Sequence, residues 1–201
     1  RVVGAYAEES RLEYIEYIFN SDDDPVLRLV SDNSLVPDYG VHFFAGTSDN
    51  DIIDGGTADT ISVTGYDGND TITGSPGRDF IDGNSGDDQI NGGDGNDILR
   101  GSDGNDTISG GGGHDEIYAG EGNDEIYAGD GDDEVHIELA DISQDAEDII
   151  DGGGGDRDKL YLPGSSLDYY FQQIGDNKYR LYDSIPNPLA TIENVEILEF
   201  D

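Results

Sequence analysis

An aspartate at every ninth position, followed two residues later by an aliphatic side chain, is the feature that most restricts how this chain can fold. Residues 65–136 consist of eight consecutive nine-residue units, from GYDGNDTIT to AGDGDDEVH, without insertion or deletion. The sixth residue of each unit is an aspartate: Asp70, Asp79, Asp88, Asp97, Asp106, Asp115, Asp124 and Asp133. The eighth residue is aliphatic: Ile72, Ile81, Ile90, Leu99, Ile108, Ile117, Ile126 and Val135. This period predicts a repeat architecture in which the aspartate and the glycines before it form a loop and the aliphatic residue forms a core.

Irregular copies of the unit flank this array. Residues 46–54 keep Asp51 and Ile53 in register, whereas residues 55–64 keep Asp59 but depart from the regular spacing. Residues 148–160 form a variant repeat, which makes Asp148 and Asp158 further candidates. We therefore expect three parts: a flanking or capping segment at residues 1–45, the repeat region at 46–136, and a variant repeat with a β-rich C-terminal cap at 137–201.

The flanking segments predict mostly strands. Ser10 and Glu13 fit a capping box and slightly favour a short helix over residues 10–19, although the alternation in the same stretch also fits a strand. Residues 26–30 are expected to form a strand, and the apolar residues 40–45 to cover the open end of the repeats. Further strands are expected at 159–162, 169–174, 178–182 and 195–200, with a hairpin turn at residues 175–177.

The loop half of each unit has the composition of an oxygen-rich metal site. Glycine at the first, second or fourth position allows tight turns with positive φ and lets carbonyl oxygens point inward. Carbonyls and a carboxylate together suit calcium, which takes six to eight oxygen ligands at about 2.3–2.6 Å. Zinc would need histidine or cysteine, and the chain has 3 histidines and no cysteine.

The three residues after each aspartate suit a short strand whose middle side chain points inward. Two units return the chain to its starting side, so equivalent loops stack every eighteen residues, about 4.8 Å apart. The pattern therefore predicts two columns of ions, one along each edge, with the aliphatic residues facing one another across a thin core.

Residues 92–100, GGDGNDILR, closely resemble the nonapeptide G-G-x-G-x-D-x-U-x of RTX proteins, in which U is a large apolar residue. The resemblance extends with small departures over roughly half of the chain. It implies an all-β fold, a parallel β-roll or β-solenoid with eighteen residues per coil that binds several calcium ions.

The resemblance also implies a set of ligands. The aspartates would bind calcium through carboxylate oxygens shared between adjacent sites: Asp51, Asp70, Asp79, Asp88, Asp97, Asp106, Asp115, Asp124 and Asp133, with Asp59, Asp148 and Asp158 as weaker candidates. Loop carbonyls would complete the shells: Gly65, Asp67, Gly68, Gly74, Gly77, Gly83, Ser85, Gly86, Gly92, Asp94, Gly95, Gly101, Asp103, Gly104, Gly110, Gly112, Gly113, Ala119, Glu121, Gly122, Gly129 and Gly131. Departures from the family pattern at Asp49, Pro76, Arg78, Ala119 and Ala128 put the ligand geometry in question, mainly near Asp51 and Asp79.

The charge of the chain supports a cationic partner. There are 47 acidic and 9 basic residues, for a formal net charge of −38. A chain this acidic resembles a disordered one unless cations neutralise it, and it lacks the basic clusters that bind nucleic acid. No apolar run is long enough to span a bilayer. The chain begins at Arg1 without an initiator methionine, and we expect it to be a piece of a longer polypeptide.

These observations predict a calcium-dependent folding and stabilising module of a secreted bacterial RTX protein, with upstream domains of the parent as partners. In this family the chain leaves through a type I secretion channel unfolded and folds in extracellular calcium. The main alternative is a module of an RTX adhesin that binds a glycan or a surface, through residues 1–45 or the C-terminal cap; an accessory module of a secreted enzyme or toxin is another. The absence of HExxH, GxSxG and cysteine argues against catalysis within this fragment.

Overall fold

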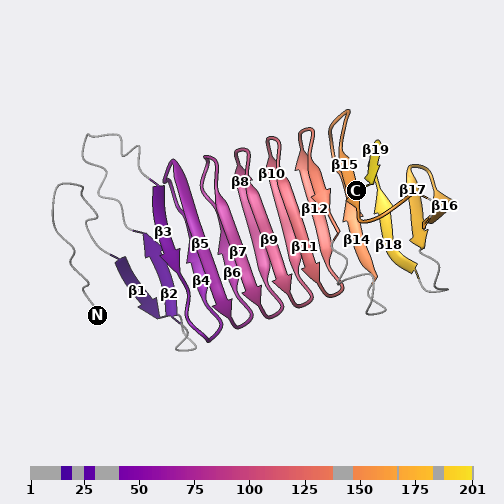
Figure 1. Cartoon of the computed structure of the whole chain (residues 1–201). Coiled ribbons are helices and arrows are strands. Elements are labelled where there is room, and N and C mark those ends of the chain that lie inside the picture. The colour runs from indigo at the N-terminus through magenta and orange to yellow at the C-terminus, as the bar shows by residue number, and fades with distance from the viewer. Residues whose placement is uncertain are drawn as a thin grey trace.

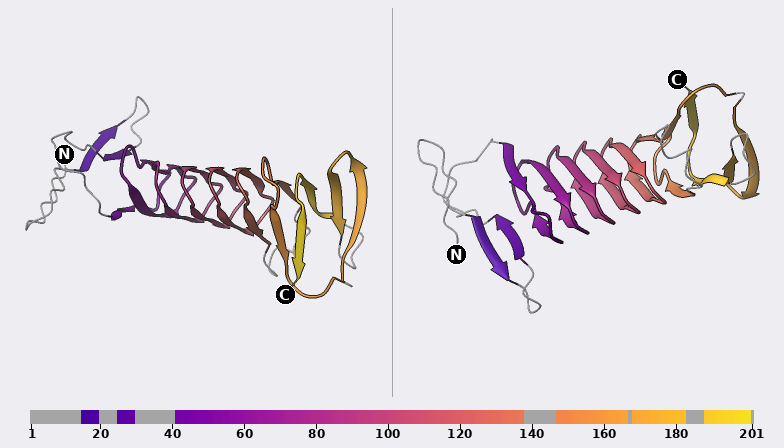
Figure 2. Two further views of the ribbon diagram at one scale, coloured as in Figure 1. Left: turned by 90° about the horizontal axis from the view of Figure 1, so that it is seen from above. Right: turned by 60° about the horizontal axis from the view of Figure 1, so that its bottom comes forward.

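The chain forms an elongated roll of two β-sheets (Figure 1). The computed structural model describes residues 15–19, 25–29, 41–137, 147–166, 168–182 and 188–200, with backbone alone for residues 15–19, 25–29 and 41–42. All elements in these ranges are strands. The two sheets lie face to face along the roll (Figure 2). The predicted all-β parallel solenoid is therefore confirmed.

Successive strands of the array alternate between the two sheets. The first sheet contains, in spatial order, β1 (Ile15–Phe19), β2 (Pro25–Leu29), β4 (Ile52–Asp54), β6 (Thr71–Thr73), β8 (Gln89–Asp94), β10 (Thr107–Gly112), β12 (Glu125–Asp130), β14 (Asp148–Asp151), β18 (Pro188–Glu193), β17 (Lys178–Tyr182) and β16 (Tyr170–Gly175). The second contains β3 (Val41–Ala45), β5 (Thr60–Asp67), β7 (Phe80–Ser85), β9 (Ile98–Asp103), β11 (Glu116–Glu121), β13 (Glu134–His136), β15 (Lys159–Leu162) and β19 (Ile197–Phe200).

Within each sheet, equivalent residues of neighbouring coils pair in parallel. Ile108 of β10, for example, lies between Ile90 of β8 and Ile126 of β12. Most of these strands are longer than the three residues expected, because the ladder continues into the first residues of the next loop, as it does in β9. The eighteen-residue period is therefore a property of backbone pairing as well as of sequence.

The aliphatic residue of each unit forms the core. All eight such residues of the array are buried, and Leu99, Ile108, Ile117 and Ile126 have no exposed surface. Their neighbours in each strand point outward, as the alternating exposure of β8 and β12 shows. The core is thus a thin double row of side chains between the two sheets.

At the N-terminal end the helix prediction is wrong and the strand alternative is correct. Residues 15–19 form β1, which pairs antiparallel with β2, while β2 pairs parallel with β4. Pairing with the open edge of the first sheet satisfies backbone groups that a helix would leave unpaired there. Residues 10–14 lie outside the described residues. The strand expected at 26–30 is confirmed as β2, and β3 is the edge strand of the second sheet.

At the C-terminal end the parallel coils continue beyond residue 136. β14 and β15 pair parallel with β12 and β13, and β18 and β19 add a further coil. β16 and β17 then form the expected hairpin, which pairs antiparallel with β18. The sequence predicted β15, β16, β17 and β19 but not β18, nor that β15 and β19 belong to the roll.

Candidate metal centres

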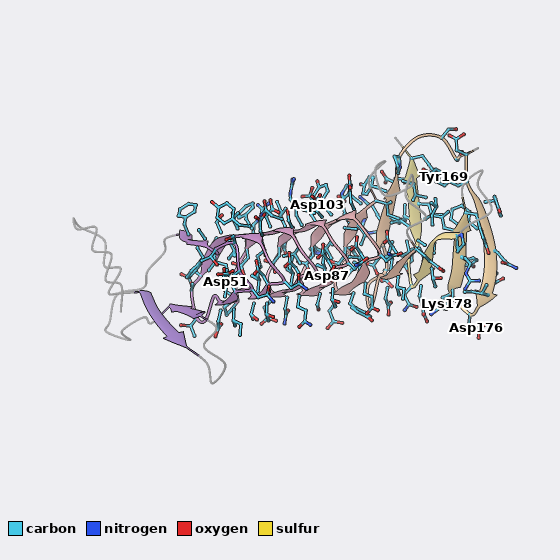
Figure 3. All side chains as sticks on the ribbon, turned by 90° about the horizontal axis from the view of Figure 1, so that it is seen from below. Asp51, Asp87, Asp103, Tyr169, Asp176 and Lys178 are labelled. Carbon is cyan, nitrogen blue, oxygen red and sulfur yellow. The ribbon has the colours of Figure 1, made fainter. Side chains whose placement is uncertain are left out.

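The aspartates of the repeats form two columns, one at the N-terminal ends of the strands of each sheet. The first column contains Asp51, Asp70, Asp88, Asp106, Asp124 and Asp148, and the second contains Asp79, Asp97, Asp115, Asp133 and Asp158. All are buried, with at most 3% of the residue exposed. Other acidic side chains, such as Asp103, project from the roll instead (Figure 3). Burial of these carboxylates, in a chain covered with exposed ones, marks them as a separate group.

Asp59 does not belong to either column, and this corrects the predicted register. Residues 62 and 63 pair with residues 80 and 81, so Ile61 stands where an aspartate would stand, and Val63 takes the aliphatic position. Asp59 is exposed, while Ile61 and Val63 are buried. The sequence matched Asp59 and Ile61 to the motif by local spacing, but the backbone ladder places them two residues earlier in the coil.

Beyond Asp51, which begins the first column, one oxygen of each column carboxylate accepts an amide of the preceding coil. The amide of Asp97 donates to Oδ1 of Asp115 over 2.8 Å, and the amide of Asp106 donates to Oδ1 of Asp124 over 2.8 Å. The same bond recurs along both columns, through to Asp148 and Asp158. Each carboxylate is therefore fixed in orientation by its neighbour.

In most aspartates of the two columns the second carboxylate oxygen, Oδ2, is buried without a hydrogen-bond partner. This is the case for Asp70, Asp88, Asp97, Asp106, Asp115, Asp133 and Asp158. Burying a carboxylate oxygen without compensation is costly, so such an oxygen calls for a cation.

Backbone carbonyls converge on the same space. A Cβ on Gly92 would lie 2.5 Å from Oδ2 of Asp97 and 2.6 Å from the carbonyl oxygen of Gly110, in the next coil. A Cβ on Gly101 would likewise lie 2.3 Å from Oδ2 of Asp106 and 2.5 Å from the carbonyl oxygen of Ala119. Glycine at these two positions leaves room for oxygens in the space that a side chain would fill. This donor set fits calcium.

Side chains alone do not complete such a site. Within the described part of the chain, no group of three or more His, Cys, Asp or Glu side chains is arranged to hold a metal ion. The remaining ligands would have to be carbonyls, as expected for a hard cation. Among the predicted carbonyls, those of Ser85, Asp103, Gly112 and Glu121 each accept an amide from the preceding coil. Their role as ligands stays a prediction.

Regular loops share one backbone conformation. The second and fourth residues have positive φ, as in Gly93 and Gly95 with φ of 106° and 140°. The second position keeps positive φ even where it is not glycine, with 78° at Tyr66, 74° at Asn84 and 82° at Ser102. The unit at residues 74–82 is different, because neither Ser75 nor Gly77 has positive φ.

A family model for the RTX calcium-binding nonapeptide repeat, in four copies, matches residues 43–61, 64–99 and 100–135. The three matched segments are thus RTX calcium-binding nonapeptide repeats. A comparison with curated proteins gave no match. No helix among the described residues is long and apolar enough to cross a membrane. The matched segments end before Asp148 and Asp158, although the structure places both carboxylates in the same columns as those of the RTX units.

Burial makes seven of the column carboxylates weaker acids. It raises the pKa of Asp97 and Asp106 to about 7, and that of Asp88, Asp133 and Asp158 to about 6. The amide from the preceding coil lowers the pKa, and the charges of neighbouring aspartates raise it, but desolvation is the largest effect. The pKa values of Asp70 and Asp115 are raised for the same main reason. A divalent cation would keep these groups ionised.

Two further side chains accept a backbone amide of a neighbouring coil, and the repeat pattern did not predict them. Glu196 stands at the aspartate position of the last coil, where its Oε2 accepts the amide of Asp158 over 3.0 Å. Its sequence signal is the aliphatic Leu198 two residues later, the spacing found in every regular unit. His114, at a fifth position, accepts the amide of Asp132 on Nδ1 over 2.9 Å. Neither residue was among the predicted ligands.

Proposed function

We propose that this chain is a calcium-dependent folding and stabilising module of a secreted RTX protein. The observation that carries the proposal is the pair of stacked columns of buried aspartates, in which Oδ2 of seven residues lacks a hydrogen-bond partner. Calcium would supply two positive charges and would be coordinated by these oxygens together with carbonyls of adjacent loops. Repeats of this family bind calcium, while the number of ions in this chain is part of the proposal.

Without calcium, charge repulsion and chain entropy oppose the folding of the repeats. In each column the backbone amide of one aspartate donates to the carboxylate of the next. Folding therefore brings like charges together in a buried space, where they repel. The core between the sheets is thin, and the entropy of ordering a glycine-rich chain is large. We therefore infer that the repeats are disordered without calcium. Because each coil contacts its neighbours in sequence, binding at one loop pair favours the next.

The proposed setting is the extracellular medium after type I secretion. RTX repeats are typical of secreted bacterial proteins, and modules that fold outside the cell bind calcium at about 10⁻⁴ to 10⁻³ M. A chain with that affinity stays unfolded in calcium-poor cytosol and folds outside. The activity of the parent protein would then reside in upstream domains, and this fragment would not be an enzyme.

The adhesin alternative receives little support from the described surface. Tyr118, His136 and Tyr161 line the outer face of the second sheet, but their rings stack on one another at 4.5 and 4.4 Å. Ring faces used in this way are not available to stack on a sugar. A nearby hollow of about 300 Å³ is lined by charged groups that already form ion pairs, Arg157 with Asp132 and Lys159 with Glu134.

Far-UV circular dichroism in chelator and during a calcium titration tests the proposal. We expect a disordered spectrum in chelator and a cooperative gain of β structure with calcium, but not with magnesium at the same concentration. Asp97→Asn and Asp106→Asn, one in each column, should each raise the calcium midpoint, whereas Glu125→Gln, at an exposed residue of β12, should not. A spectrum that is β-rich in chelator and indifferent to calcium refutes the proposal.

A further inference from the structure

The first carboxylate of each column differs from those that follow it. Asp51 begins the first column, and Asp79 begins the second, because the preceding coil has Ile61 at the equivalent position. Neither residue is among those with an unpartnered Oδ2. Both stand in the roll's N-terminal coils, where its two ion columns would begin.

The carboxylate of Asp79 is enclosed by hydrogen-bond donors of its own protein. The amide of Ser75 donates to Oδ2, and the hydroxyl of Ser75 donates to Oδ1 over 2.7 Å. The amide of Ile61 also donates to Oδ1, over 2.7 Å. Ser75 stands where regular units have a residue with positive φ, and its different backbone conformation turns its amide toward the carboxylate.

Asp51 is enclosed in a similar way at the other edge. The amide of Thr47 donates to its Oδ2, four residues before the aspartate, as Ser75 lies four residues before Asp79. The unit also lacks the fourth-position glycine, since Asp49 stands there. Two loops with different sequence departures therefore reach the same result, an amide on Oδ2.

One coil later, the equivalent oxygens have no such donor. Oδ2 of Asp70, which follows Asp51, and Oδ2 of Asp97, which follows Asp79, are buried without a partner. Glycines approach all four carboxylates closely: a Cβ would lie 2.8 Å from Oδ2 at Gly46, 2.3 Å at Gly65, 2.6 Å at Gly74 and 2.5 Å at Gly92. A close glycine is therefore common to all four loops, and the amide on Oδ2 distinguishes Asp51 and Asp79 from Asp70 and Asp97. An amide hydrogen directed at an oxygen carries positive charge into the place where a cation would bind.

We propose that the carboxylates of Asp51 and Asp79 bind no calcium, because Thr47 and Ser75 take the place of the ion, and that each calcium column starts one coil later, at Asp70 and at Asp97. This inference rests on the proposed function. The first coil of the roll, with Asp51 enclosed and Ile61 in place of an aspartate, is then held together without ions. Ser75 acts as a positioning residue that fixes the carboxylate of Asp79 through two donors.

Four matched variants test this proposal by isothermal calorimetry with calcium: Asp51→Asn against Asp70→Asn in the first column, and Asp79→Asn against Asp97→Asn in the second. Asp70→Asn and Asp97→Asn should lower the number of ions bound per chain. Asp51→Asn and Asp79→Asn should leave that number unchanged, and should lower the melting temperature in saturating calcium. A loss of ions in Asp79→Asn as large as that in Asp97→Asn overturns the proposal.

A second variant keeps the test decisive if Asp79→Asn does not fold. Ser75→Ala removes the hydroxyl donor and keeps the amide, so we expect the wild-type number of ions and a lower melting temperature. If the hydroxyl oxygen were instead a calcium ligand, Ser75→Ala would bind fewer ions, and a change in ion number overturns the proposal. A wild-type chain that binds no calcium refutes the proposed function itself, whereas unequal ion counts among the variants concern this inference alone.

Discussion

The fourth-position glycines predict a sharp contrast between two alanine substitutions in neighbouring units. Gly104 has φ of 139°, and a Cβ on it would lie 2.0 Å from the carbonyl oxygen of Gly86 in the preceding coil. Gly112, at a third position, has no positive φ, and a Cβ there would lie 3.6 Å from its nearest neighbour, Oδ1 of Asp94. Both glycines lie in the central coils, so the comparison isolates local geometry.

The expected cost follows from these distances. Holding alanine at positive φ costs about 1–2 kcal/mol. Moving the backbone of Gly86 away from the new methyl group costs about 1–3 kcal/mol more, because a stacked carbonyl cannot rotate aside as a side chain can. Gly104→Ala should therefore lower the free energy of unfolding by about 2–5 kcal/mol. Gly112→Ala should change it by less than about 1 kcal/mol, and can be stabilising, because alanine reduces the entropy of the unfolded chain.

Urea unfolding in saturating calcium, followed by circular dichroism, measures both free energies. Saturation is needed because a bound ion adds to the stability of the folded state. The calcium midpoint of Gly104→Ala should rise as well, since the displaced carbonyl belongs to a loop of the first column. If the two variants differ by less than about 0.5 kcal/mol, the close approach of stacked loops does not contribute as the structure indicates.

Three further predictions concern the core, the outer face and pH. Leu99→Ala, at a residue with no exposed surface that lies between Ile81 and Ile117, should lower the free energy of unfolding by about 2–5 kcal/mol, and Leu99→Ile by less than about 1.5 kcal/mol. His136→Ala should cost about 1–3 kcal/mol, because two stacked ring contacts are lost, and His136→Phe should restore most of it; equal losses would contradict the stacking argument. Because burial raises the pKa of Asp97 and Asp106 to about 7, the calcium-free folded form binds protons more tightly than the unfolded chain, and the resulting stabilisation is lost as pH rises from about 4 to 7. In chelator, dichroism should therefore show more β structure at pH 5.5 than at pH 7.5, and equal spectra would contradict this assignment.

The parts of the fold that sequence could predict are those in which local pattern and long-range pairing coincide. Asp97 and Leu99 are six and eight residues into a regular unit, and the backbone ladder repeats with the same period, so burial of both followed from spacing. The prediction for Asp59 was wrong because local spacing and strand pairing give different registers there. β5 is eight residues long, and its register is set by pairing with β7. β18 was missed because no glycine-rich loop precedes it, and its place in the roll depends on pairing with β14.

The hydrogen bonds of each loop also lay outside what spacing can predict. Ser75 matches the motif poorly, but its two donors occupy the place of an ion at the carboxylate of Asp79. A serine at the second position predicts this role only when its backbone conformation is known, because Ser102 occupies the same position in another unit with positive φ and bonds to Asp82 instead.

The contrast between the fifth and sixth positions explains why one varies and the other does not. Adjacent amides of a loop donate in opposite directions: that of Asn105 to Oδ1 of Asp87 in the preceding coil, and that of Asp106 to Oδ1 of Asp124 in the following coil. A fifth-position side chain needs one acceptor for this purpose, and asparagine, aspartate or the Nδ1 of His114 provides it. At the sixth position one oxygen is used in the same way, and a second oxygen must remain for the ion. An amide or an imidazole has one acceptor to offer, whereas a carboxylate has two, so aspartate alone among these side chains can serve both the neighbouring coil and a calcium ion.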